Sequence, residues 1–309
     1  MTMHTTLEKD EISASDLNAI TSIFKTFLRD IDYKPQAIQD TNVQLEEAMY
    51  NEMHNLGICC DQLERTLHLA ASYVEIIYQD CNLAEKIIIA KFTWYMIYID
   101  DMVSKDPTPV VAFQERFLRR QPQLDPVLDA AAEVFMRIYQ YYDAYAANCI
   151  ITSALEFLTF FSVEAKIQEF PLVRKAHRFP WFLRERTGVA EGFAFLMFPK
   201  RLGVDIMEYI QAMPDMVIWI DLANDLLSFY KEEHAGDSAN YIHTRAFVEE
   251  KAPIQVLDEV ANDLHSSASS ILATITQCPK AIRAWRFCQY GYVHWHLSQD
   301  RYKLKDLGL

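Results

Sequence analysis

Three oxygen-bearing side chains recur at four-residue intervals in the stretch NDLLSFYKEE, residues 224–233. They are Asn224, Ser228 and Glu232, and the preceding residues, MVIWIDLA, are mostly apolar and predict a buried helix. Positions four apart on a helix drift by only about 40°, so we expect the three side chains on one face. An amide, a hydroxyl and a carboxylate oxygen together suit Mg²⁺, although a polar stripe facing solvent is the alternative interpretation.

A second acidic group lies in YIDDMVSKD, residues 98–106. Asp100 and Asp101 close an otherwise apolar helix predicted over 83–103. Adjacent carboxylates repel each other unless a positive charge lies beside them. This stretch alone fits either a Mg²⁺ ligand group or a solvated helix end.

Cationic side chains occur at three further points. Arg184 lies in FLRERTGVAEG (182–192), Lys231 lies beside Glu232, and Arg301 precedes Tyr302 in HWHLSQDRYK (294–303). Each alone is typical of a helix end or a surface ion pair. Together with two acidic edges they favour a diphosphate held by Mg²⁺ ions and cations, which would stabilise it as a leaving group.

Helical periodicity dominates the elements that must position these residues. There are only seven glycines and no strand pattern of convincing length, which favours an all-α fold. We expect a tail over 1–15 and one α-helical domain over 16–309, with breaks at 106–109, 121–126, 179–181 and 234–240. The predicted helices span 16–30, 38–55, 60–79, 83–103, 124–146, 148–168, 203–232, 253–276 and 279–298.

Composition excludes several classes of protein. A net charge of −14 argues against nucleic-acid binding. The six cysteines include no CxxC pair, so reduced thiols are expected, and the polar, acidic start lacks a targeting signal. No apolar run reaches the roughly 18–20 residues of a membrane span. A cytoplasmic protein without a membrane span is the expectation.

These residues carry a family resemblance. The chain resembles the class I terpene synthases, and within them the fungal trichodiene synthase family. NDLLSFYKE, residues 224–232, matches every position of the family motif (N/D)Dxx(S/T)xx(K/R)E, and Arg301-Tyr302 stands where that family has an Arg-Tyr pair. FLRERTG, residues 182–188, fits its diphosphate-sensing arginine pattern, and GYVHWHL (291–297) is similar to its C-terminal segment. The likeness runs from about residue 80 to the C-terminus.

The resemblance implies a helical bundle around a central cavity and a carbon–oxygen lyase that cyclises an isoprenoid diphosphate, farnesyl diphosphate above all. Three Mg²⁺ ions would act as cofactor, and a homodimer is a common state of such enzymes. The implied metal ligands are Asp100, Asn224, Ser228 and Glu232. The implied diphosphate-binding residues are Arg184, Lys231, Arg301 and Tyr302. Asp101 would be a hydrogen-bonding partner in the catalytic set.

Two departures from the family pattern stand out. Where the family has a further acid after its Asp pair, this chain has Ser104 and Lys105, and the acid arrives only at Asp106. The trichodiene synthase family has an extra arginine before its Arg-Tyr pair, whereas this chain has Asp300. Asp221, on the same helical face as Ser228, has no assigned catalytic role, and a structural hydrogen bond is the expectation for it.

The cation formed from the substrate needs an apolar, aromatic cavity. The candidate cavity residues lie one or two helical turns from the metal ligands, at the helix break or near the C-terminus, and ordinary core packing is their alternative role. They are Thr93, Met96, Ile97, Phe157, Phe161, Gly188 and Trp295.

Two other functions are considered. An isoprenyl diphosphate synthase shares the fold and the metal chemistry but uses two Asp-rich motifs, whereas the second motif here is Asn-Ser-Glu. A non-catalytic helical paralogue is the other alternative. The sequence leaves the terpene product open, including whether water quenches the last cation.

Overall fold

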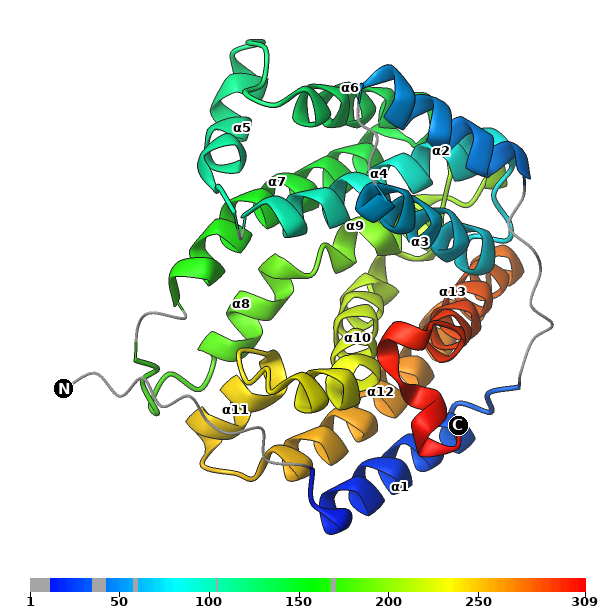
Figure 1. The fold of residues 1–309 in the computed structure, drawn as a ribbon. Helices are drawn as coiled ribbons and strands as arrows, with labels where there is room; N and C mark the ends of the chain where they lie inside the picture. The colour runs from blue at the N-terminus through cyan, green and yellow to red at the C-terminus, as the bar shows by residue number, and fades with distance from the viewer. Residues whose placement is uncertain (1–11, 35–42, 58–60, 104, 168–170) are drawn as a thin grey trace.

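The computed structural model describes residues 12–34, 43–57, 61–103, 105–167 and 171–309, and these ranges contain no strand. The predicted all-α architecture is therefore confirmed (Figure 1). The α-helices are α1 (Ala14–Asp30), α2 (Val43–Asn55), α3 (Asp61–Ile77), α4 (Leu83–Val103), α5 (Thr108–Leu118), α6 (Pro126–Tyr141), α7 (Ala144–Ile167), α8 (Phe179–Thr187), α9 (Ala190–Phe195), α10 (Met213–Ala235), α11 (Tyr241–Glu249), α12 (Pro253–Thr274) and α13 (Pro279–Ser298). Short 3-10 helices are η1 (Lys200–Leu202), η2 (Ile206–Glu208), η3 (Ile210–Ala212), η4 (Asp300–Tyr302) and η5 (Leu304–Leu307).

A ring of helices forms the centre of the molecule. Helices α3, α4, α7, α8, α10 and α13 each contact the next in that order, and α13 contacts α3 in turn. Figure 1 shows this ring, with α4 and α7 opposite α10. Helix α9 packs on α7 and α10, while α2, α5, α6, α11 and α12 contact ring helices from outside and α1 packs on α12. Side chains that point inward from the ring can therefore converge.

Helix α10 ends shortly after Glu232. Gly236 adopts the left-handed conformation (φ 74°), and its N–H bonds to the carbonyls of Glu232 and Glu233. This is a common helix-ending arrangement that glycine adopts without strain. The chain then turns back, and Asn240 caps α11 by accepting a hydrogen bond from the His243 N–H at 2.9 Å. The loop after α10 is thereby held beside Glu232.

The chain breaks between α8 and α9 at two consecutive residues. Gly188 has φ −93°, which any residue adopts, whereas Val189 has φ +54°. A β-branched residue in the left-handed region is an outlier that costs about 1–3 kcal/mol, and such residues cluster at functional sites. The requirement for glycine at 188 must therefore come from its surroundings and not from its backbone angle.

Several predicted boundaries differ from the structure. Helices α5, α8, α9 and α11 were not predicted. For α5 and α8 the reason is that prolines at 107, 109 and 180 indicated breaks. Pro109 and Pro180 instead occupy the first turns of α5 and α8, where no N–H is needed. The helix predicted over 203–232 begins only at Met213, after consecutive 3-10 turns. The start of the helix predicted at 38 lies outside the described residues.

One helix bears on the expectation that the chain has no membrane span. Within the described residues, Ala144–Val163 of α7 is long and apolar enough to pass as a membrane span by length and composition, and half of it is buried in the fold. Helix α7 contacts α4, α5, α6, α8 and α9. A core helix passes the same test, because it too is apolar on most faces.

One cluster of buried apolar side chains extends from α1 to η5. It includes three tryptophans that are fully buried: Trp94, Trp219 and Trp285. The division into a tail over 1–15 and a domain over 16–309 stays a prediction, since residues 1–11 are outside the described ranges.

Candidate active site

A cavity of about 620 Å³ lies inside the ring, with walls from α3, α4, α7, α8, α10 and α13. It brings together all the residues that the sequence singled out for metal or diphosphate chemistry. These are Asp100, Asp101, Arg184, Asn224, Ser228, Lys231, Glu232, Arg301 and Tyr302. Residues that lie up to about two hundred positions apart in the sequence therefore line the same cavity.

Five of the seven predicted cavity residues line the cavity. Thr93, Ile97, Phe161, Gly188 and Trp295 line the cavity. Met96 and Phe157 do not, and both are buried in the core instead.

The polar row on α10 consists of Asn224, Ser228 and Glu232, and among the described residues one of its groups lacks a hydrogen-bond partner. Ser228 is 2% exposed, and its Oγ has no hydrogen-bond partner among the described residues. Buried polar atoms without a partner are rare, and each needs an explanation. Asn224, one turn earlier, donates a hydrogen bond that lowers the pKa of Tyr292, although burial raises that pKa overall. The hydroxyl of Ser228 is therefore free to bind a ligand.

Glu232 is oriented from the loop after α10. Its Oε2 accepts a hydrogen bond from Nδ2 of Asn240 at 3.0 Å, and its Oε1 lies 3.8 Å from Nζ of Lys231. The Oδ1 of Asn240 is already engaged in capping α11. The Asn240 amide is thus fixed at both ends, and the direction of the Glu232 carboxylate is fixed with it.

Asp100 lies across the cavity on the last turn of α4. Its carboxylate is exposed to the cavity but surrounded by the walls, and this desolvation raises its pKa to about 6. Neighbouring Asp101 raises the pKa further, whereas Arg301 and Lys231 lower it. A raised pKa at a paired acid is what a site awaiting a cation would have.

Two cations of the cavity lie close to one aromatic ring. Nζ of Lys231 and Cζ of Arg301 each lie 5.4 Å from the centre of the Tyr302 ring. Burial lowers the pKa of Lys231, Glu232 opposes this, and Arg301 adds to it. Burial raises the pKa of the Tyr302 hydroxyl to about 12, so it stays a neutral donor. The three groups offer donors of different geometry to an anion.

Arg184 reaches from α8 to α10 and is held by two acids. Its Nε donates to both oxygens of Asp225 at 2.8 and 2.9 Å, and its Nη1 donates to Oδ1 of Asp221 at 2.9 Å. Its Nη2 donates to the Asp221 carbonyl at 2.9 Å. Burial raises the pKa of Asp221 to about 7 and of Asp225 to about 6, and Arg184 opposes both shifts.

Aromatic side chains form part of the cavity wall. The Tyr73 ring meets Trp295 edge-to-face at 5.2 Å and Phe193 at 5.6 Å. Trp295 is anchored by its Nε1, which donates to Ser72 Oγ at 3.1 Å. Such rings present negative faces to a cation and no nucleophile.

His296 also lines this wall. Its Nδ1 lies 2.8 Å from the Tyr292 carbonyl and therefore carries the proton, while its buried Nε2 has no partner among the described residues. Burial lowers its pKa to about 3, so the imidazole stays neutral.

The donors fit Mg²⁺ better than a softer metal. No three His, Cys, Asp or Glu side chains group into a metal site in the described part of the chain. Asn224, Ser228 and Glu232 instead supply amide, hydroxyl and carboxylate oxygens, and Asp100 adds a carboxylate from α4. Hard oxygen donors of limited number are typical of Mg²⁺ sites that share the ion with a phosphate ligand.

Sequence reasoning missed several lining residues. Asp225 is the second letter of the NDLLSFYKE motif, and its place there was a usable signal. Asn240 lies in the stretch HAGDSAN, and Tyr292 lies in GYVHWHL. Tyr73 comes from α3 and had no distinguishing pattern. Asp106 lies outside the lining, where its Oδ1 accepts a hydrogen bond from Thr108 N at the start of α5.

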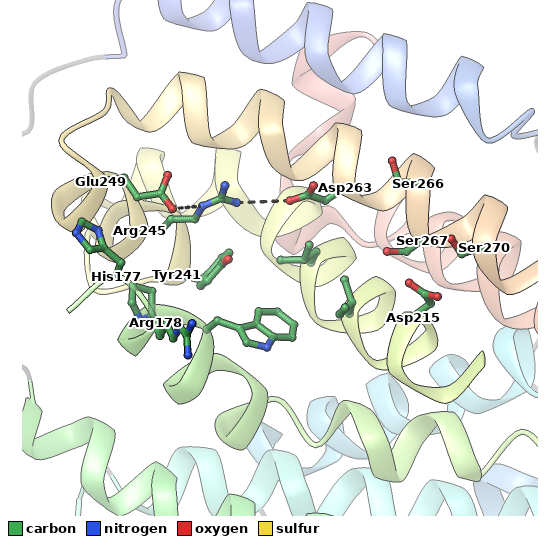
Figure 2. A pocket seen from close by; sticks show the side chains of 14 residues that line it. His177, Arg178, Asp215, Tyr241, Arg245, Glu249, Asp263, Ser266, Ser267 and Ser270 are labelled. Carbon is green, nitrogen blue, oxygen red and sulfur yellow. Dashed lines mark hydrogen bonds and ion pairs between the residues drawn. The ribbon is translucent and has the colours of Figure 1, made fainter. Parts of the chain in front are cut away.

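A second cavity of about 580 Å³ lies on the other side of α10, between α8, α11 and α12. Figure 2 shows Arg245 reaching between Glu249 and Asp263 at its edge, with Asp215 of α10 on the opposite wall. Nε of Arg245 donates to Glu249 at 2.9 Å, and its Nη1 lies 3.6 Å from Asp263. None of the residues expected to bind metal or diphosphate lines this cavity.

Comparison with known proteins agrees with this geometry. The family model for trichodiene synthase (TRI5) matches residues 39–308. The chain is 32% identical to terpene synthase BipA of Cochliobolus sativus over 302 residues, which cover 96% of this chain and 93% of that protein. It is 29% identical to longiborneol synthase of Gibberella zeae over 296 residues, which cover 93% and 87% of the two chains.

The fold is similar to that of solved structures. The linalool/nerolidol synthase of Streptomyces clavuligerus in complex with 2-fluorogeranyl diphosphate superposes with a TM-score of 0.67 at 14% identity, over 84% of this chain and 100% of that one. With the family model matching most of the chain, the protein belongs to the trichodiene synthase family of terpene synthases.

Proposed function

We propose that this protein is a Mg²⁺-dependent class I sesquiterpene cyclase. In this proposal it ionises farnesyl diphosphate, releases diphosphate and cyclises the resulting cation to a hydrocarbon or an alcohol, which makes it a carbon–oxygen lyase. The observation that carries the proposal is that Asn224, Ser228 and Glu232 of α10 line one cavity with Asp100 of α4, and that the buried Ser228 hydroxyl has no partner in the described part of the chain. A surface stripe would leave that hydroxyl to water.

Four residues would hold the metal: Asp100, Asn224, Ser228 and Glu232. When bound, Mg²⁺ would neutralise charge on the diphosphate oxygens and so favour their departure. Asp100 must lose its proton to become a ligand, and its pKa of about 6 allows this near neutral pH.

The diphosphate would be bound by the cations beside Tyr302. Lys231 and Arg301 both lie near the Tyr302 ring and close enough to Asp100 to lower its pKa. Tyr302 would donate from its neutral hydroxyl. Arg184 would bind from the opposite wall, because its guanidinium lines the same cavity. Charge that develops on the leaving group would thus meet donors already in place.

The remaining wall would protect and shape the cation. Tyr73, Phe193 and Trp295 supply aromatic surface, and Thr93, Ile97 and Phe161 supply the rest of the contour. Exclusion of water by these side chains would keep the cation from early quenching. The neutral His296 adds no positive charge that would oppose it.

Names of relatives support this substrate class. They include longiborneol synthase and an (E)-beta farnesene synthase, and the solved linalool/nerolidol synthase binds 2-fluorogeranyl diphosphate. Chain elongation is less well supported, because the second motif here is Asn-Ser-Glu instead of a second Asp-rich motif. We also propose a cytoplasmic location and a homodimer. Light scattering would test the homodimer.

The test uses purified protein with Mg²⁺ in three arms: farnesyl diphosphate, geranyl diphosphate, and farnesyl plus isopentenyl diphosphate. We expect a volatile sesquiterpene by gas chromatography–mass spectrometry in the first arm, unchanged by isopentenyl diphosphate. A longer prenyl diphosphate in the third arm alone would identify an elongating enzyme. A volatile product in the second arm alone would assign a ten-carbon substrate, and no product in any arm would support the non-catalytic alternative.

A further inference from the structure

The contacts of Arg184 with α10 leave part of its guanidinium free. Arginine has five N–H donors. One on Nε serves Asp225, one on Nη1 serves Asp221 Oδ1, and one on Nη2 serves the Asp221 carbonyl. By this count one N–H on each terminal nitrogen remains for a ligand in the cavity that Arg184 lines. Two acids therefore fix the plane of the guanidinium without using all its donors.

Asp221 also fills the space beside Gly188. A Cβ at position 188 would lie 1.9 Å from Asp221 Oδ1 and 2.3 Å from Arg184 Nη1. Since the backbone angle at Gly188 suits any residue, the missing side chain is explained by this close approach. The ion pair between Asp221 and Arg184 thus packs directly on the break between α8 and α9.

Stability alone does not account for Asp221. It is 1% exposed, and its Oδ2 has no hydrogen-bond partner among the described residues. Glu85, a comparably buried acid, has both oxygens bonded to Arg201 and accepts from Asn82 N as well. A buried carboxylate with an unsatisfied oxygen is costly to the fold, so its presence needs an explanation other than stability.

We propose that Asp221 is a positioning residue that holds Arg184 in the orientation needed to bind the departing diphosphate. Asp225 fixes the Nε edge and Asp221 fixes the terminal edge, so Arg184 does not have to be ordered when the ligand arrives. This inference deepens the function proposed above and rests on it.

The first test compares Asp221→Asn with the matched control Asp215→Asn. Asp215 is a second acid on α10, but it lines the other cavity (Figure 2). For Asp221→Asn we expect kcat with farnesyl diphosphate to fall about tenfold, because a misplaced catalytic contact has effects of this order. We expect the Kd for Mg²⁺ with inorganic diphosphate, by calorimetry, to rise about threefold, since a side chain must then be ordered on binding. Asp215→Asn should change neither value.

Repeating the Asp221→Asn substitution in an Arg184→Lys variant shows whether Asp221 acts through Arg184. In the Arg184→Lys variant, which lacks the two-sided guanidinium, adding Asp221→Asn should lower kcat by less than about twofold. An equal loss in both backgrounds, no loss in either, or tighter diphosphate binding by Asp221→Asn would overturn the inference. Tighter binding would mean that Asp221 only repels the anion.

Gly188→Ala keeps the inference testable if Asp221→Asn does not fold. The added methyl must displace the Asp221 carboxylate and the Arg184 Nη1 beside it, so kcat should fall at least as far as for Asp221→Asn. Gly192→Ala, whose Cβ has its nearest contacts with Val189 and Ser153 at 3.3 Å or more, should affect kcat less. Turnover by the wild type distinguishes failure of the proposed function from failure of the role of Asp221. If the wild type gives no product, the proposed function fails. With wild-type product and an unaffected Gly188→Ala variant, only the role of Asp221 fails.

Discussion

Asn240 donates a hydrogen bond from Nδ2 to Oε2 of Glu232 at 3.0 Å, while its Oδ1 caps α11 through the His243 N–H at 2.9 Å. One side chain therefore joins the end of the α10 row to the start of the next helix. Because Asn240 has both roles, substitutions can separate the orientation of Glu232 from the stability that capping of α11 contributes.

Asn240→Asp should separate them. Aspartate caps helices as well as asparagine does, but it cannot donate to Glu232 and places a second carboxylate beside it. We expect kcat/KM to fall about tenfold and the Mg²⁺ concentration for half-maximal activity to rise, as is usual when the partner of a metal ligand is lost. Asn240→Ala should in addition lose about 1 kcal/mol of stability. An Asn240→Asp enzyme with wild-type Mg²⁺ dependence would contradict this role.

Ser228→Ala should uncouple stability from metal binding. Because Ser228 Oγ is buried without a partner among the residues that the structure describes, its removal should leave the free energy of unfolding unchanged or slightly higher in the metal-free protein. The thermal stabilisation by Mg²⁺ plus inorganic diphosphate should fall markedly. Ser153→Ala is the matched control, because Ser153 Oγ accepts the Gly192 N–H at 3.1 Å.

That control should show the opposite pattern. Ser153→Ala leaves a buried N–H unpaired and should lose about 1–3 kcal/mol of stability, with the Mg²⁺-dependent shift retained. If Ser228→Ala destabilised the metal-free protein as much as Ser153→Ala does, the hydroxyl would have a structural partner and not a ligand.

Two phenylalanines on α7 separate the cavity wall from the core. Phe161 lines the cavity, whereas Phe157, with its ring 5.2 Å away, does not. Phe161→Leu should change the distribution of terpene products, because it changes the contour that folds the substrate. Phe157→Leu should lower stability by about 1 kcal/mol and leave the product distribution unchanged. Equal product shifts in both variants would show that the wall extends behind Phe161.

Asp221 should make metal-free stability depend on pH. Burial raises its folded-state pKa to about 7, above the ordinary carboxyl value, with Arg184 opposing and Asp225 and Glu185 adding to the shift. The protonated acid therefore stabilises the fold fully below about pH 4, and this contribution is lost as the pH rises through about 7. Stability of the wild type relative to Asp221→Asn should fall across that window by up to about 1.4 kcal/mol per pH unit. A difference that rises with pH would contradict the shift.

The α10 row could be predicted because it depends only on spacing within one helix. Asn224, Ser228 and Glu232 share a face at any placement of α10, and all three line the cavity. Helical geometry could also have excluded Met96. Taking Thr93 as zero, Asp100 and Ile97 lie at about −20° and +40°, whereas Met96 lies at about −60°, outside that arc.

Contacts between helices could not be predicted from the sequence. The pairing of Arg184 with Asp221 depends on how α8 packs on α10, and nothing in the spacing of either segment sets that packing. The same holds for Asn240, which reaches Glu232 only because Gly236 ends α10 and turns the chain back. Helix α8 itself was missed because Pro180 is a breaker within a helix but favourable in a first turn.

The most direct test of the central claim measures two products of one reaction. Wild-type protein is incubated with farnesyl diphosphate and Mg²⁺, and volatile terpene and free diphosphate are quantified in the same samples, with Glu232→Gln and a chelator-treated wild type alongside. We expect the two products in equal amounts from the wild type, and at least about a hundredfold less of each from both controls. Diphosphate release without a terpene, or equal turnover with the chelator, would contradict a metal-dependent cyclase.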